Sequence, residues 1–147
     1  MPNYNTEQSY KTLVIIWFAL LFSQIMLLVV VYFAKPEVYK FDFNKPLLGE
    51  NPALVIAFAA IAVANLVLSF VLKKRSIEQA IEKQQIGLVQ TGLILAYAFC
   101  EASSLLGMVL AFAFSYQYFF LWFGLGIIGV ILHFPRREDV VAASYKK

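Results

Sequence analysis

Glu101 is the residue whose type and surroundings most clearly indicate chemistry. It is the only charged residue in an apolar stretch from Ile86 to Phe114, and it lies 15 residues after the start of that stretch. A charge in the middle of a membrane helix costs at least ~2.5–3.5 kcal/mol, so desolvation favours the neutral, protonated carboxyl. A carboxyl group that can change between its charged and its neutral form can bind and release a proton. We therefore predict that Glu101 is an ion-binding site for protons.

Four residues are predicted partners of Glu101 at a similar depth. Gln24 and Asn65 lie within two other apolar stretches, and Tyr97 and Ser104 lie about one turn away on either side of Glu101. Under an alternative interpretation, a protonated Glu101 hydrogen-bonded to Gln24 or Asn65 only stabilises helix packing. The sequence leaves both interpretations open.

The remaining reactive side chains indicate no further chemistry. Cys100 is the single cysteine and His133 the single histidine, and we expect the first to pack as a small residue and the second to lie at a membrane interface. The sequence contains no metal-ligand spacing, no nucleophile paired with a base and no phosphate-binding loop. We expect no metal, no cofactor and no enzymatic activity.

Apolar helices are the elements that would position these residues. The chain has 147 residues, of which 61% are hydrophobic and 14% charged. Soluble domains are about 45–50% apolar and about 25% charged, and roughly 20 apolar residues suffice to cross a bilayer as a helix. The runs lack the alternation of strands. The sequence predicts an all-α fold, an integral membrane four-helix bundle forming a single domain over 1–147. The expected spans are 12–34, 52–72, 86–114 and 118–134.

The positive charges predict the orientation of this bundle. Nine Lys and Arg residues lie in the N-terminal tail, the 73–85 loop and the C-terminal tail, whereas the 35–51 loop holds three. Because cytoplasmic loops carry the excess of positive charge, both termini are expected in the cytoplasm. The basic cluster at 73–75 directly follows a span, which indicates a helix anchor contacting lipid rather than nucleic acid. The predicted location is the bacterial inner or plasma membrane. We also expect the 73–85 loop to be helical.

Small residues recur along three of the spans and predict close helix packing. The stripes comprise Ala53, Ala57, Ala60 and Ala64; Gly92, Ala96, Cys100, Ser104, Ser103, Gly107 and Ala111; and Gly124, Gly126 and Gly129. We expect most of them to pack inside the bundle. Because the stripes exceed what one bundle needs, we also expect a homo-oligomer or contacts with other membrane subunits.

The segment around Glu101 resembles the carboxylate helix of the proteolipid subunit c of rotary ATP synthases and ATPases. That helix typically reads Ala-x-x-Glu-Ala, followed by Gly-x-Val-x-Ala, and residues 98–102 and 107–111 match both parts at the same spacing. The resemblance covers the third span and, loosely, its hairpin with the second. The resemblance implies that Glu101 carries a proton. The residue directly after Glu101 is Ala102 and not a hydroxyl residue, and in this respect the chain is similar to the proton-type members of that family.

Two functions are therefore predicted. The first is a small polytopic membrane protein that handles protons through Glu101. The second is a structural or accessory subunit of a membrane complex, in which Glu101 only stabilises helix packing.

Overall fold

The computed structural model describes residues 4–144, and within this range every regular element is helical. Three long helices, α1 (Tyr4–Ala34), α2 (Pro52–Lys83) and α3 (Ile86–Phe114), are followed by the shorter α4 (Phe120–Leu132). Two short elements complete the chain, the 3-10 helix η1 (Pro36–Tyr39) and α5 (Arg137–Ala142). The predicted all-α fold is confirmed.

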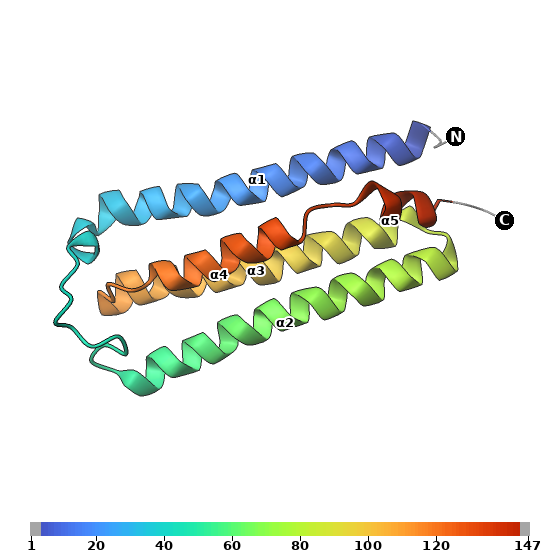
Figure 1. The fold of residues 1–147 in the computed structure, drawn as a ribbon. Helices are drawn as coiled ribbons and strands as arrows, with labels where there is room; N and C mark the ends of the chain where they lie inside the picture. Colours follow the sequence, from blue (N-terminus) through green and yellow to red (C-terminus); the bar gives the residue numbers. More distant parts are fainter. Residues whose placement is uncertain (1–3, 145–147) are drawn as a thin grey trace.

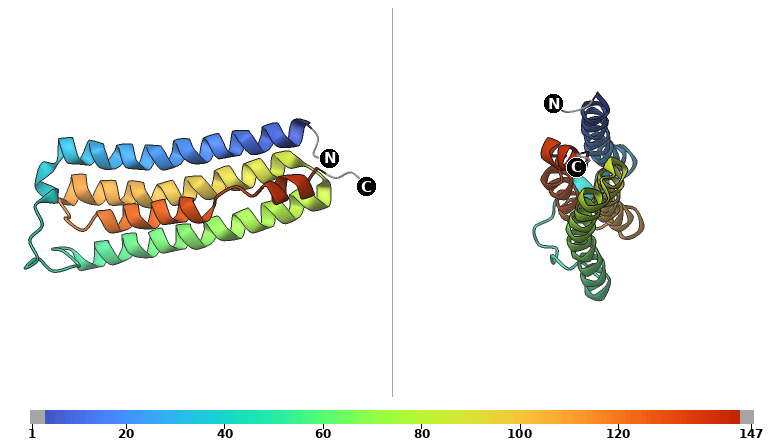
Figure 2. Two further views of the ribbon diagram at one scale, coloured as in Figure 1. Left: turned by 45° about the horizontal axis from the view of Figure 1, so that its top comes forward. Right: turned by 90° about the vertical axis from the view of Figure 1, so that its right-hand side faces the viewer.

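The helices form an elongated bundle in which α3 and α4 lie between α1 and α2 (Figure 1). The end-on view in Figure 2 shows α1 and α2 on opposite sides of this central pair. The most extensive helix contact joins α2 and α3, and α4 packs mainly on α3. Both ends of the described chain lie at one end of the bundle, the termini end, and the 35–51 loop lies at the other, the loop end (Figure 1).

Three helices are long and apolar enough to cross a membrane. They contain 31, 32 and 29 residues, so at 1.5 Å per residue they measure roughly 44–48 Å, against a hydrocarbon core of about 30 Å. The extra length of α2 comes from the basic segment, which continues the helix to Lys83 as predicted. The helix stops at Gln84, whose φ of 52° is left-handed, and α3 begins two residues later.

The helix within the predicted fourth span, 118–134, is shorter than the span itself. This helix, α4, has 13 residues, or roughly 20 Å, against a hydrocarbon core of about 30 Å. The backbone of Ser115 is in the left-handed conformation and a turn follows it, so α4 begins only at Phe120. Pro135 cannot continue a helix, and the chain leaves α4 at His133 and reaches α5 in extended form.

Side chains of α1 and α3 donate hydrogen bonds to backbone carbonyl groups at the end of α4. The indole Nε1–H of Trp17 donates to the Val130 carbonyl at 2.7 Å, and the Tyr97 hydroxyl donates to the His133 carbonyl at 3.2 Å. The His133 N–H itself bonds back to Gly129 and Val130. A broken helix is tolerated inside a membrane protein only when its freed backbone groups find such partners.

The small-residue stripes divide into an inner and an outer set. The stripe of α3 is buried, as are Gly126 and Gly129 of α4. In contrast, Ala53, Ala57, Ala60 and Ala64 of α2 are all exposed. Most of these small residues therefore pack inside the bundle as expected. The stripe of α2 is the exception, because this helix turns the opposite face, with Val55, Ala62 and Ser69, inwards.

Candidate functional site

The Glu101 carboxyl is held by the middle of α1. The Ser23 hydroxyl donates a hydrogen bond to Glu101 Oε1 over 2.9 Å, which joins α1 to the centre of α3. Both side chains are partly buried. Glu101 lies on α3 between the buried face of that helix and its exposed face, which includes Leu105. The carboxyl therefore sits at the edge of the α1–α3 seam and not deep inside the bundle.

A second polar pair lies directly beside the first. The Ser104 hydroxyl donates to Gln24 Oε1 at 3.0 Å, and both residues are fully buried. Within residues 4–144 the Gln24 amide nitrogen has no hydrogen-bond partner. Consecutive residues of α1 thus bond residues one turn apart on α3, because Ser23 pairs with Glu101 and Gln24 with Ser104.

Gly126 of α4 closes the inner side of this polar cluster. A Cβ atom at Gly126 would overlap the Ser104 hydroxyl and lie 2.7 Å from the Cys100 carbonyl and 3.1 Å from Gln24 Oε1. Only a residue without a side chain lets α4 approach so closely. The cluster of Ser23, Gln24, Glu101, Ser104 and Gly126 is the candidate functional site.

The predicted partners of Glu101 take other roles in the structure. Gln24 bonds Ser104, Tyr97 bonds the end of α4, and Asn65 is a partly buried residue of α2. The hydrogen-bond partner of the carboxyl is Ser23, which sequence reasoning did not select. The available signal was its position next to Gln24 in the middle of an uncharged span.

The charges of the chain lie away from this cluster. The ion pairs among the described residues are Lys35–Glu37, Lys74–Glu78 and Arg137–Glu7, all near helix ends. Across residues 4–144 no cation pairs with Glu101, and no cluster of three His, Cys, Asp or Glu residues could hold a metal ion. The hydrogen-bond partner of the carboxyl is a neutral hydroxyl, that of Ser23.

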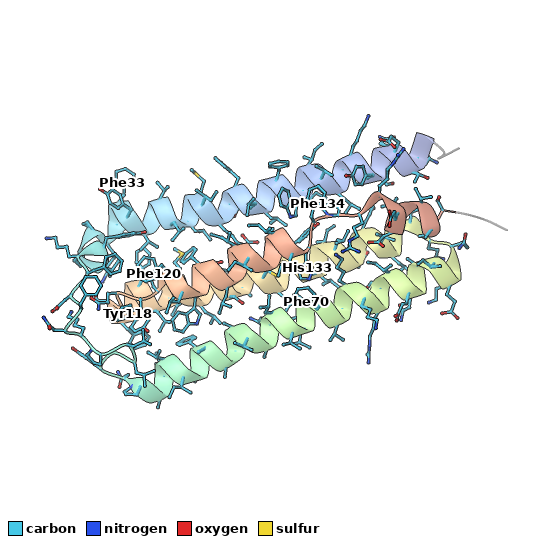
Figure 3. The ribbon with its side chains drawn as sticks, viewed as in Figure 1. Phe33, Phe70, Tyr118, Phe120, His133 and Phe134 are labelled. Carbon is cyan, nitrogen blue, oxygen red and sulfur yellow. The ribbon has the colours of Figure 1, made fainter. Side chains whose placement is uncertain are left out.

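His133 and Cys100 are packed into the bundle. Figure 3 shows His133 beside Phe70 of α2, where the ring centroids lie 4.3 Å apart. Its Nδ1 lies 2.6 Å from the Gly129 carbonyl, which can only accept, so Nδ1 carries the proton. Cys100 is buried, and its sulfur lies 3.7 Å from the Ser69 hydroxyl. His133 is thus fully buried at the end of α4, and its expected position at a membrane interface stays a prediction.

Asp139 is a titratable group with altered surroundings outside the apolar helices. It lies in α5 at the termini end, where burial raises the pKa of its carboxyl. The positive charges of Lys73 and Arg136 oppose this shift without cancelling it. Its titration is therefore coupled to the packing of α5.

The surface of the helices defines the class of the protein. The outer face of α1 exposes large apolar residues, among them Ile15, Phe18 and Phe22 at 60–68%. A water-soluble bundle rarely leaves such a continuous apolar face open, whereas lipid solvates it. The three long apolar helices place the chain among the helical membrane proteins. No protein-family model, curated protein or solved structure matches it.

Proposed function

We propose that this chain is a small multi-pass membrane protein that handles protons through Glu101. The observation that supports the proposal most strongly is the isolation of the carboxyl. It lies near the centre of an apolar helix, accepts a bond from the neutral Ser23 hydroxyl and has no described cation partner. Exchange of a proton with such a carboxyl requires contact with water or a partner subunit.

The position of Glu101 at the α1–α3 seam suggests how this contact is made. The α1 helix is the least buried of the three long helices, and the hydroxyl–carboxyl bond lies at the edge of its contact with α3. Separation of α1 from α3 at this level would expose the carboxyl and allow it to exchange a proton. The resemblance of the Glu101 segment to proteolipid subunit c supports the same role.

The proposed setting is the bacterial inner or plasma membrane with both termini in the cytoplasm. The nine-to-three distribution of positive charge supports this orientation. A reporter fused to either terminus is expected to be cytoplasmic, and one inserted near Asp42 is expected outside. Termini on opposite sides of the membrane would contradict the proposal.

Two measurements test proton handling. A hydrophobic carbodiimide reacts with a protonated carboxyl, so Glu101 is expected to be labelled slowly, and less as pH rises. Glu101→Gln keeps the shape of the side chain but cannot titrate. In liposomes it is expected to fold normally and abolish proton flux or any coupled activity.

Ser23→Ala serves as the matched control. It removes the hydrogen bond of 2.9 Å but leaves the titrating carboxyl, so proton flux should persist. Full activity of Glu101→Gln, or no labelling at any pH, would reject proton handling.

A specific observation also favours an accessory, structural role. The Ser23–Glu101 and Gln24–Ser104 bonds lie side by side and fix the register between α1 and α3. If this is their only role, Ser23→Ala should lower stability by about 0.5–1.5 kcal/mol. Glu101→Gln should change stability little, because its amide oxygen still accepts the bond from Ser23, and neither variant should change proton flux.

A further inference from the structure

A cavity of about 440 Å³ lies at the loop end of the bundle, between the start of α2, the end of α3 and the 35–51 loop. Its size falls in the range of small-ligand sites, about 300–1,000 Å³. Loop residues, among them Lys45, Glu50 and Asn51, supply charged and polar groups, whereas Leu54 and Phe114 belong to the apolar helix walls. The lining is thus polar towards the loop and apolar along the helices.

The wall formed by residues 116–118 holds the loop in place over this cavity. The hydroxyls of Tyr116 and Tyr118 donate to the carbonyls of Leu47 and Lys45 at 2.6 and 3.2 Å. The Gln117 amide exchanges two hydrogen bonds with the backbone of Asp42, at 2.8 and 3.1 Å. Three consecutive side chains therefore fix the loop backbone, so the cavity is formed in advance.

Gly49 is part of the same arrangement. Its φ of 64° is left-handed, and a Cβ atom there would lie 3.2 Å from the Tyr116 ring. Glycine thus allows the loop to turn tightly against the tyrosine that lines the cavity.

Two opposite charges line the cavity without neutralising each other. Among residues 4–144 neither Lys45 nor Glu50 takes part in an ion pair, and both side chains belong to exposed residues. An ammonium group suits a phosphate oxygen, and a carboxylate suits a primary ammonium. One ligand carrying both a phosphate and an ammonium group complements this pair of residues.

We propose that the cavity binds the headgroup of a zwitterionic phospholipid with a primary ammonium, of the phosphatidylethanolamine type. Helices of this length cross a bilayer, so their loop end lies at the depth of the lipid headgroups. The phosphate would contact Lys45, the ammonium Glu50, and an acyl chain the apolar walls at Leu54 and Phe114. The site is independent of Glu101 and of proton handling.

Native mass spectrometry of the full chain in mild detergent tests the site. Phosphatidylethanolamine, phosphatidylcholine and phosphatidylglycerol are added separately at equal concentrations, and bound lipid is counted. We expect phosphatidylethanolamine to be retained best, because the quaternary ammonium of phosphatidylcholine cannot donate a hydrogen bond and phosphatidylglycerol has no cation for Glu50. Equal retention of phosphatidylethanolamine and phosphatidylcholine would overturn the proposal.

Three substitutions distinguish the charged groups from the cavity itself. Glu50→Gln should remove the preference for phosphatidylethanolamine, and Lys45→Gln should weaken its binding about tenfold, as expected for one charge-assisted bond. Ala113→Phe fills the cavity from an exposed position and should reduce binding of every lipid. Lys40→Gln, which removes a loop charge outside the cavity, should change nothing.

Two results would count against the site. Binding of phosphatidylethanolamine at the wild-type level in all three cavity variants would show that the lipid lies elsewhere. A preference for phosphatidylglycerol that increases in Glu50→Gln would show an anion site instead of a zwitterion site.

Discussion

Gly126 offers the most direct test of the polar cluster, because α4 packs against α1 and α3 at this residue. In Gly126→Ala the new methyl group would overlap the Ser104 hydroxyl and lie 2.7 Å from the Cys100 carbonyl. The carbonyl belongs to the backbone of α3, so α4 must move away from α3. Overpacking of this kind costs about 1–3 kcal/mol.

Gly124→Ala is the matched control on the same helix. A Cβ atom at Gly124 meets nothing within 4 Å, so the substitution adds no clash. Alanine is also favoured over glycine inside a helix by about 0.5–1 kcal/mol. The two variants make the same chemical change one turn or less apart, and they are expected to shift stability in opposite directions.

Thermal unfolding in detergent, followed by circular dichroism, measures the difference. For a chain of this size about 1 kcal/mol shifts Tm by roughly 2–4 °C, so Gly126→Ala should unfold several degrees below Gly124→Ala. Adding Ser104→Ala to Gly126→Ala removes the overlapping hydroxyl and should recover part of the loss. Equal Tm values for the two glycine variants would refute the close approach of α4 to the cluster.

Three further predictions concern the rest of the bundle. Trp17→Phe removes the N–H that the Val130 carbonyl accepts and should lower the free energy of unfolding by about 0.5–1.5 kcal/mol; an unchanged denaturation midpoint would show that this bond contributes nothing. Ala62→Leu adds bulk to a fully buried position and should cost about 1–3 kcal/mol, whereas Ala60→Leu lies on the exposed face and should leave the monomer stable. A change in oligomer size on gel filtration of Ala60→Leu alone would show that this face contacts another subunit. Burial raises the pKa of Asp139, so its charge disfavours the folded state above that pKa; Asp139→Asn should be more stable than wild type at neutral pH, and unfolding measured at decreasing pH should show this advantage shrinking.

The sequence alone determined the class of fold and the presence of a carboxyl inside an apolar helix. Hydropathy and run length are local properties, and they correctly gave the all-α architecture and three helices long enough to cross a bilayer. They also identified the helical 73–83 segment, because nothing in it breaks a helix before Gln84. Cytoplasmic termini and proton handling stay predictions.

Only the tertiary structure decided which faces meet. One residue along a helix rotates the side chain by about 100°, and apolar residues suit lipid and protein interior equally well, so the sequence leaves the rotation of each helix open. For this reason Ser23, and not Gln24 or Asn65, bonds Glu101, and the alanine stripe of α2 faces outwards. The sequence likewise did not predict where α4 ends. The carbonyl groups at its end accept hydrogen bonds from Trp17 and Tyr97, which lie more than 30 residues away in the sequence.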